Sequence, residues 1–308
     1  MDISLIENIL FAMVRTGTPL LLVALGAMMS ERSGVLNLGQ EGMILVGAAC
    51  GFIAAYAGGS LGLGVLAAVA AGVAVSLVFA FIALTLISNQ VATGLALTIF
   101  GTGLSAFLGA AYVGQTVTGF APVAIPLLSD IPLIGKALFA QDALVYLSLV
   151  LFAAVFVVMR YTRLGLIIRA VGENPEVAHA LGYKVLLVRY CAVMFGGGMA
   201  GLAGAYLSLA YTPMWAEGIA AGRGWIALAL VVFASWRTER ILLGAWLFGF
   251  ASILHLLLQG YGYEISPNLL AMLPYVVTIL VLVMMMYRQQ NQGLFAPRSL
   301  GQPYHPPK

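Results

Sequence analysis

The fold class predicted by the sequence is an all-α membrane protein, a polytopic transmembrane helical bundle of about nine spans, with about eight to ten compatible with the pattern. Hydrophobic residues make up 62% of the 308 residues, charged residues 8%, and the mean hydropathy is +1.03, which is far more apolar than a water-facing surface permits. No Asp, Glu, Lys, Arg or His occurs between Gly42 and Ser129. The segment LVLFAAVFVV (149-158) does not alternate as a barrel strand would, so the spans are predicted to be helices.

Apolar runs separated by Gly, Pro and polar clusters define the individual spans. Each run approaches the roughly 20 residues needed to cross a bilayer, except the seventh, whose shortness indicates a broken helix. The 36 glycines recur four residues apart in several runs and predict close packing of the helices. The predicted spans are 5-29, 37-57, 61-86, 90-112, 141-159, 187-210, 224-236, 241-259 and 268-287.

The basic residues predict the orientation of the bundle. If the segment 160-189 is placed on one side of the membrane, alternation of the spans brings most Lys and Arg residues to that side. The positive-inside rule then makes this side cytoplasmic, with the N-terminus outside and the C-terminus inside. The basic residues on it are Arg32, Arg160, Arg163, Arg169, Lys184, Arg189, Arg237, Arg240, Arg288, Arg298 and Lys308.

The chain is predicted to form one transmembrane domain, 1-287, in a multi-pass protein of the plasma membrane. Its N-terminus lacks the basic region and cleavage site of a signal peptide, so we expect it to be retained. The segment 113-140 is the main external loop, and its prolines favour extended, turn or short re-entrant structure. The Pro- and Gln-rich tail, 288-308, is predicted to be disordered.

A short polar helix is predicted in the cytoplasmic loop 160-189, within the segment GENPEVAHALG (172-182). Asn174 is a good N-cap, Pro175 suits the first helical position, and Gly182 ends the helix. Two turns of helix are not stable alone in water, because nucleation costs more than so few hydrogen bonds return. Another surface must therefore hold this helix.

The apolar residues of this helix indicate what that surface is. Val177 and Leu181 lie one turn apart, with Ala178 beside them, and form an apolar stripe. Glu176 lies in the first turn, where the helix dipole favours a negative charge. The stripe fits either a partner protein or the membrane interface, and the residues alone favour neither.

Polar side chains open the second and fourth predicted spans, where burial is costly unless the groups pair or face an aqueous path. Amides both donate and accept hydrogen bonds, so they suit a sugar ring or a nucleobase. The alternative is hydrogen bonding between helices, at about 0.6 kcal/mol for each bond. A Trp at the external mouth of the seventh span either stacks on a base or sugar or belongs to the aromatic belt. The candidate substrate-pathway residues are Asn37, Gln40, Glu41, Asn89, Gln90, Thr93, Thr98 and Trp225.

Glu41 and Arg15 are charged residues within predicted spans, where a charge costs several kcal/mol without a partner. Glu41 is expected near the cytoplasmic end of its span, where it reaches the interface or pairs with Arg32. Arg15 has no obvious partner and is expected to be a structural anchor.

Motifs for catalysis, metal binding or nucleotide binding are absent from the sequence. The nearest fragment to a P-loop, IGKA (134-137), lacks the leading glycine and the hydroxyl residue. His179 and His255 have no second ligand at metal spacing, and no GxSxG or HExxH motif occurs. We therefore predict no catalytic, cofactor-binding or metal-binding residue, and a chain that is not an enzyme.

The short polar helix resembles a known motif. EVAHALG (176-182) is similar to the EAAxxxG motif of the membrane subunits of ATP-binding-cassette (ABC) importers. Glu176, Ala178 and Gly182 are in register, and Val177 departs from the second position. In those subunits this segment is a coupling helix that sits in a groove of the ATPase. The resemblance therefore implies ATPase-coupling roles for Glu173, Asn174, Pro175, Glu176, Val177, Ala178, Leu181 and Gly182.

Three longer segments carry a second resemblance, which extends from about residue 15 to about residue 285. SERSGVLNLGQEGMILVGA (30-48), NQVATGLALTIFGTGLSAFLG (89-109) and GRGWIALALVVFASW (222-236) resemble permeases of the ribose and branched-chain amino acid type, in the branch for nucleosides or simple sugars. The resemblance implies an importer permease in the bacterial plasma (inner) membrane. It also implies an ABC ATPase subunit that binds the ATP, a second permease subunit (a copy or a homologue), and an extracytoplasmic solute-binding protein; nothing in it points to nucleic acid.

Other classes of membrane protein remain as alternatives. An ion-coupled secondary transporter of a small polar solute usually has an ionisable residue near the bilayer centre, and the charge-free stretch 42-129 argues against a proton relay there. Sodium held by backbone carbonyls is compatible with the sequence. A membrane scaffold protein would carry no vectorial flux at all.

Overall fold

The computed structural model describes residues 3-129, 131-132, 134-260 and 296-305, with single positions between 272 and 287. Within these residues the chain is all-helical, as predicted, and six helices are long and apolar enough to cross a membrane. The ninth predicted span, 268-287, falls outside the described residues except for isolated positions. The six helices are α1 (Ile3–Arg32), α2 (Gln40–Gly58), α3 (Leu61–Ala80), α4 (Gln90–Gly109), α6 (Ala143–Tyr161) and α9 (Val185–Tyr206).

Most of the remaining helices are shorter or connect the spans. Helix α11 (Thr238–Gly260) is the exception, since its 23 residues include the predicted eighth span, 241-259. Short π or 3-10 turns continue α3, α4 and α9, so the helical paths match the predicted spans closely. The seventh predicted span is an 11-residue helix, which confirms that it is too short to cross a bilayer. These elements are η1 (Phe81–Thr85), η2 (Ala110–Tyr112), η3 (Leu207–Tyr211), α5 (Gly135–Phe139), α7 (Arg163–Glu173), α8 (Pro175–Ala180), α10 (Arg223–Phe233) and α11 (Thr238–Gly260).

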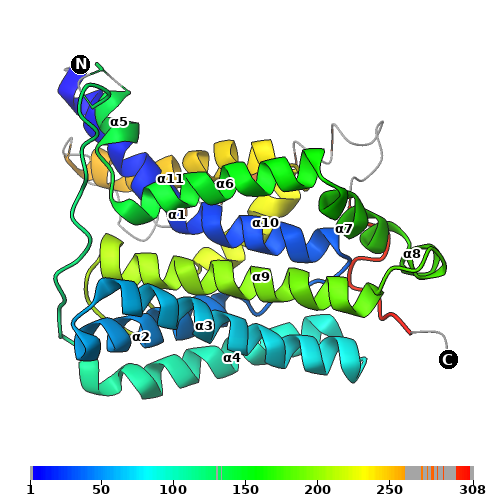
Figure 1. Ribbon diagram of the computed structural model, residues 1–308. Coiled ribbons are helices and arrows are strands. Elements are labelled where there is room, and N and C mark those ends of the chain that lie inside the picture. Colours follow the sequence, from blue (N-terminus) through cyan, green and yellow to red (C-terminus); the bar gives the residue numbers. More distant parts are fainter. Residues whose placement is uncertain are drawn as a thin grey trace.

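Helix α9 lies in the middle of the bundle (Figure 1). It packs against α1 on one side and against α2 and α3 on the other. Helices α6, α10 and α11 pack against α1, and α4 packs against α2. The central position of α9 explains why it buries a mixture of small and large side chains along most of its length.

The bundle has two ends, which we name the α5 end and the α8 end. Figure 1 shows the N-terminus and α5 at one end, and α7, α8 and the segment 296-305 at the other. At the α5 end, the segment 113-140 pairs with the segment after α9, since the Val117 N–H donates to the Pro213 carbonyl and the Phe120 N–H to the Leu209 carbonyl, both at 3.1 Å. The two long connections are therefore neighbours.

Glycines allow the close helix packing that their spacing predicts. A Cβ on Gly47 would lie 2.6 Å from the Cα of Gly201, which places α2 directly against α9. A Cβ on Gly201 would in turn overlap the backbone carbonyl of Ala68 in α3. Close contact supplies dispersion energy where lipid removes the hydrophobic force. The α2–α3–α9 interface therefore has no room for larger residues at these positions.

Residues 296-305 of the C-terminal tail form hydrogen bonds to the helical bundle. Composition predicts disorder for 288-308, yet residues 296-305 pack along the α8 end. The Ser299 N–H donates to the Gly172 carbonyl at 3.0 Å, and the Gly301 N–H to the Gly34 carbonyl at 3.2 Å. Tyr304 is 6% exposed. We call residues 296-305 the tail segment.

Candidate functional site

Helix α8 has the caps that the sequence predicts. The Asn174 side chain accepts a 3.0 Å hydrogen bond from the Val177 N–H, and Pro175 occupies the first turn. After the helix, Gly182 adopts φ +88°, a left-handed conformation that favours glycine. Its N–H donates to the His179 carbonyl at 2.8 Å. Local sequence therefore sets both ends of this helix.

The apolar stripe of α8 points away from the bundle. Val177 is 54% exposed and Leu181 is 70% exposed, and the Glu176 side chain is also exposed. Figure 1 shows α8 projecting at its end of the molecule, beyond the ends of the long helices. No described residue covers Val177 or Leu181, so this face of α8 is accessible from outside the bundle.

The face of α8 that carries Ala178, beside the exposed stripe, is held by the body of the protein. Ala178 is 1% exposed and forms a small apolar cluster with Val171, Val185 and Tyr304. These residues come from α7, α9 and the tail segment, so three elements anchor one face of the helix. These contacts stabilise a helix that would be too short to be stable alone in water.

A buried arginine joins the tail segment to the bundle. Arg189, in the first turn of α9, is fully buried and donates from Nε to the Ser33 carbonyl at 3.2 Å. Its Nη2 donates to the Ser299 hydroxyl at 3.1 Å, and its guanidinium lies 5.6 Å from the Tyr304 ring centroid. The Ser299 hydroxyl donates to the Gly172 carbonyl at 2.7 Å. Sequence reasoning placed Arg189 among the basic residues of the loop side and missed this network, although a charge beside an apolar run was a signal.

Glu41 connects two helices that begin inside the bundle. Its Oε1 accepts a 2.8 Å hydrogen bond from the Gly222 N–H, and its Oε2 accepts a 2.6 Å bond from the Gly224 N–H. These are amides at the start of α10, where a negative charge complements the helix dipole. The expected pairing with Arg32 is not formed, since the Arg32 guanidinium donates to the Trp236 carbonyl instead.

The depth of this junction follows from the length of α10. Its 11 residues span about 16 Å, and the turn after it contacts the last residues of α1 at the α8 end. The first turn of α10 therefore lies well inside the bundle. Trp225, which the sequence placed at an external mouth, lies at this depth instead. The chain reaches this depth through a turn in which Ala221 has φ +48°, a strained conformation for a residue with a Cβ.

Gln40, next to Glu41, is fully buried. Neither its Oε1 nor its Nε2 has a hydrogen-bond partner among the described residues. An unpaired buried amide in a membrane protein is costly, and such groups usually mark a polar ligand or an aqueous path. Trp225, in the first turn of α10, is 38% exposed. These two side chains and Glu41 lie where α2 and α10 begin.

Most other candidate pathway residues form hydrogen bonds within the bundle. The Asn37 Oδ1 accepts from the Gly39 N–H at 2.8 Å, and the Thr98 hydroxyl donates to the Leu38 carbonyl at 2.9 Å. Both bonds fix the segment that leads from α1 into α2. Both side chains therefore have partners within the protein.

The candidates at the start of α4 lie nearer the α8 end. Asn89 caps α4 by accepting from the Ala92 N–H at 3.0 Å, and the Thr93 hydroxyl donates to the Asn89 carbonyl at 2.8 Å. The Gln90 Oε1 accepts from the Leu36 N–H at 2.8 Å. Its Nε2 donates to the Gln302 carbonyl of the tail segment at 3.4 Å. These groups form a polar layer between α4 and the tail segment.

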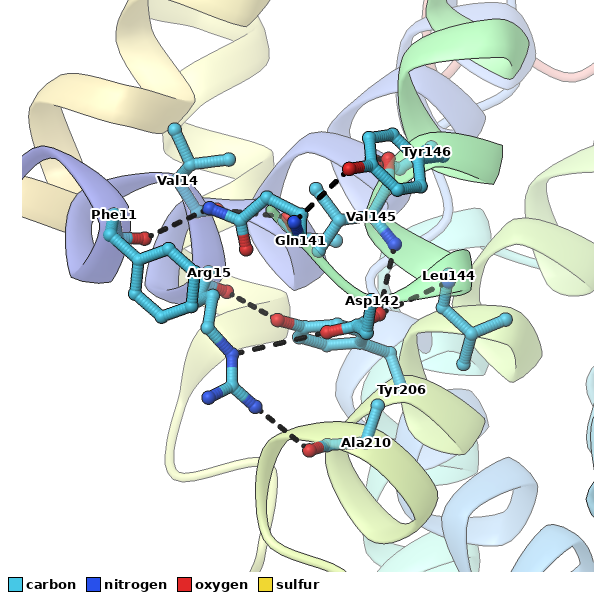
Figure 2. Close-up of polar contacts among 12 residues, drawn as sticks. Phe11, Val14, Arg15, Gln141, Asp142, Leu144, Val145, Tyr146, Tyr206 and Ala210 are labelled. Atoms are coloured by element: carbon cyan, nitrogen blue, oxygen red, sulfur yellow. Dashed lines mark hydrogen bonds and ion pairs between the residues drawn. The ribbon is translucent and has the colours of Figure 1, made fainter. Parts of the chain in front are cut away.

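Arg15 has partners that sequence reasoning did not find (Figure 2). Its Nη2 donates to the Ala210 carbonyl at 2.9 Å, and its Nε lies 3.9 Å from the Asp142 Oδ2. The Tyr206 hydroxyl donates to the Arg15 carbonyl at 2.9 Å. Asp142 also caps α6 by accepting from the Leu144 N–H at 3.0 Å.

The environment of Asp142 is nearly dry, since the residue is 2% exposed. Asp142 stands apart in the sequence, directly before an apolar run, which is an N-cap signal. Its pairing with α1 could not be inferred from that signal. The cluster joins α1, α6 and α9 near the α5 end.

The fold and these sites define a class: a multi-pass membrane protein with buried polar groups where helices are interrupted and a short helix exposed at one end. Residues 9-285 match the family model described as the permease component of a branched-chain amino acid transport system. The chain belongs to this family of ABC transporter permeases. It is a transport subunit and not a catalytic one.

Comparison with known proteins gives relatives along the whole chain. The putative glucose ABC transporter permease TsgC13 of Haloferax volcanii is 42% identical, over 98% of each protein. The guanosine ABC transporter permease NupQ of Bacillus subtilis is 34% identical, over 99% of this chain and 98% of that protein. The nucleoside ABC transporter permease NupC of Lactococcus lactis is 32% identical, over 92% of this chain and 93% of that protein.

Proposed function

We propose that this chain is the permease subunit of an ATP-driven importer of nucleosides, with glucose or another simple sugar as the second candidate. The observation that carries the proposal is the full-length similarity to permeases described as transporting guanosine, nucleosides and glucose. Both substrate classes share a hydroxylated ring, which suits amide donors and acceptors. The glucose candidate is favoured by the 42% identity to the haloarchaeal permease.

The proposed substrate pathway passes the junction of α2 and α10. It is supported by the unpaired amide of Gln40 and by the two helix starts that meet at Glu41. Interrupted helices whose N-termini face a polar site are a common way to bind solutes inside a membrane. Trp225, in the first turn of α10 and 38% exposed, is an aromatic residue suited to stacking on a base or sugar.

We place the ATPase at α8. The exposed Val177 and Leu181 side chains supply an apolar contact surface, and Glu176 supplies a charge beside it. The tail segment gives a route from this helix inward, since its contacts reach Gly34 and Gln90 next to the segment that leads into α2. Closure of two ATPase subunits would move α8 and, through these contacts, the α2–α10 junction.

The orientation and partners follow from this placement. The α8 end carries Arg32, Arg160, Arg163, Arg169 and Arg237, so it faces the cytoplasm by the positive-inside rule. A solute-binding protein would then contact the paired segments at the α5 end. A second permease subunit, identical or homologous, completes the pathway in a prokaryotic plasma membrane.

Uptake into proteoliposomes tests the substrate and the energy source. The permease is reconstituted with its ATPase, its second permease subunit and its solute-binding protein, with ATP on the side of the membrane that holds the ATPase. We expect accumulation of labelled guanosine that excess unlabelled nucleoside suppresses and glucose does not. Accumulation of labelled glucose instead moves the assignment to the second candidate. Transport that continues without the ATPase or without ATP contradicts the importer mechanism and favours an ion-coupled carrier.

A double substitution on α8 tests the docking role. We expect Glu176→Lys with Leu181→Asp to abolish co-purification of the ATPase and ATP-dependent uptake, because charges replace the apolar and acidic contacts. The matched control, Glu176→Asp with Leu181→Met, keeps both properties and should bind normally. If the charged variant co-purifies with the ATPase and transports like the parent protein, α8 is not the docking site.

A further inference from the structure

A pocket rich in arginine lies at the α8 end, between the ends of α1, α6 and α7 and the turn from α10 to α11. It encloses about 360 Å³. Membership of the permease family does not by itself give this pocket a function. Its lining residues are Arg32, Phe156, Met159, Arg160, Arg169, Trp236, Arg237, Thr238 and Glu239. We name it the arginine pocket.

The guanidinium groups in the arginine pocket are held in place by the protein. Arg32 donates from Nε and Nη2 to the Trp236 carbonyl, at 3.1 and 2.8 Å. Arg160 lies over the Phe156 ring, 5.8 Å from its centroid, and Arg169 donates from Nε to the Gly165 carbonyl at 3.2 Å. A guanidinium carries five N–H donors, so each of these groups has further donors for a ligand. Fixed forks of donors suit the oxygens of a phosphate group.

The turn between α10 and α11 is strained at this pocket. Ser235 and Trp236 have φ of +51° and +55°, although neither is glycine. The turn is held by the 2.6 Å hydrogen bond from the Trp236 indole to the Glu31 carboxylate and by the contact of Arg32 with the Trp236 carbonyl. Consecutive left-handed residues persist only when surrounding contacts impose them, and they concentrate at functional sites.

The positive charge of the pocket exceeds its negative charge. Four arginines face one glutamate, Glu239, whose carboxylate lies 4.0 Å from the Arg160 Nη1. This ion pair is open to solvent, because the side chains of Arg160 and Glu239 are 58% and 45% exposed. Such a weak pair leaves Arg160 available to an anion.

Apolar surfaces continue from the pocket along two neighbouring helices. On α6, Val150 is 63% exposed and Val157 48% exposed, and on α11, Leu243 is 66% exposed. Helices α6 and α11 contact one another and run side by side in Figure 1. Exposed apolar side chains on these two helices offer a surface for acyl chains. An anion site at the α8 end therefore lies beside an exposed apolar surface on α6 and α11.

We propose that the arginine pocket binds the phosphate headgroup of an anionic phospholipid from the leaflet on the α8 side. The headgroup contacts the guanidinium groups of Arg160 and Arg169, and its acyl chains lie against α6 and α11. Bound there, the lipid links α6 and α7 to the strained turn that ends α10. Basic pockets between helices at a membrane surface are suited to such headgroups. A soluble anion would gain the same charge contacts but would leave the apolar surfaces unused.

Native mass spectrometry of the purified transporter complex tests the lipid site. The complex is equilibrated with equal amounts of phosphatidylglycerol and phosphatidylcholine, and the lipids that remain bound are counted. We expect enrichment of phosphatidylglycerol, reduced about fivefold or more by Arg160→Gln with Arg169→Gln. The matched control is Arg163→Gln with Lys184→Gln, which removes the same charge from the same end but outside the pocket lining. It should keep the enrichment.

Three outcomes overturn the proposal. Equal loss of enrichment in the control variant shows a diffuse surface charge and no specific site. Pocket-dependent binding of inorganic phosphate in neutral detergent, without preference for phosphatidylglycerol, assigns the pocket to a soluble anion. Loss of the ATPase from the pocket variant in phosphatidylcholine alone, with unchanged lipid preference, assigns the arginines to the partner protein. Each result is independent of which solute the permease transports.

Discussion

The carboxylate of Glu41 accepts a 2.6 Å hydrogen bond from the backbone N–H of Gly224 and thereby ties the start of α2 to the start of α10. The two residues are far apart in the sequence, yet a Cβ on Gly224 would lie only 2.7 Å from the Glu41 Cα. Glycine is needed here because the helix start must approach another backbone. An acidic residue beside it satisfies amides that have no partner within α10.

Replacing Glu41 should weaken both the fold and transport. Glu41→Ala leaves the amides of Gly222 and Gly224 unpaired, which costs about 1 to 3 kcal/mol for each buried group. Glu41→Gln keeps the shape and one acceptor oxygen, so its unfolding midpoint should lie between those of the parent and Glu41→Ala. Thermal unfolding in detergent and ATP-dependent uptake are measured together. An alanine variant as stable as the parent would show that these hydrogen bonds contribute nothing.

The cap of α8 should matter for ATPase binding. Asn174→Ala removes the acceptor for the Val177 N–H and should destabilise the helix by about 1 kcal/mol. Asn174→Asp retains the cap and serves as the control. We expect faster amide hydrogen exchange from Val177 to Leu181 and weaker ATPase co-purification for the alanine variant only. Unchanged exchange in both variants would mean that packing of Ala178 alone holds the helix.

The tail segment should stabilise the α8 end through Ser299. Ser299→Ala removes a partner of the buried Arg189 Nη2, and Arg189 Nη1 already has no partner among the described residues. The expected cost is about 1 to 3 kcal/mol, seen as a lower unfolding midpoint. Gln302→Ala is the control, because Gln302 contacts Gln90 through its backbone carbonyl. Equal midpoints for the serine variant and the control would contradict a bracing role of the tail segment.

Glycine positions should differ sharply in their tolerance of a methyl group. Gly201→Ala forces a Cβ into the Ala68 carbonyl and should cost about 1 to 3 kcal/mol by overpacking. A Cβ on Gly103 would meet nothing within 4 Å, so Gly103→Ala should keep the parent unfolding midpoint. A destabilised Gly103 variant with a stable Gly201 variant would contradict the packing of α2, α3 and α9.

Much of the fold could be predicted from local patterns. Apolar run length predicted the long helices, six of which are long and apolar enough to cross a membrane among the described residues, and the short seventh run matches the 11-residue helix α10. The caps of α8 at Asn174 and Gly182 were also predictable, because capping depends on residues within one turn of the helix end. Contacts between distant segments were not predictable in this way. Arg15 with Asp142, and Glu41 with Gly224, connect positions whose separation in sequence carries no periodic signal.

Composition, the lengths of the apolar runs and the α8 motif are properties of the chain alone, so they were enough to predict a helical membrane bundle, a short capped helix and membership of a permease family. The roles of the isolated charges depend on how the helices pack. Burial makes an unpaired charge costly, so each finds a partner, and the partner is whichever group the packing of the helices brings within reach. For Glu41 that group is the start of α10, for Arg189 the tail segment, and for Arg32 the carbonyl of a strained turn.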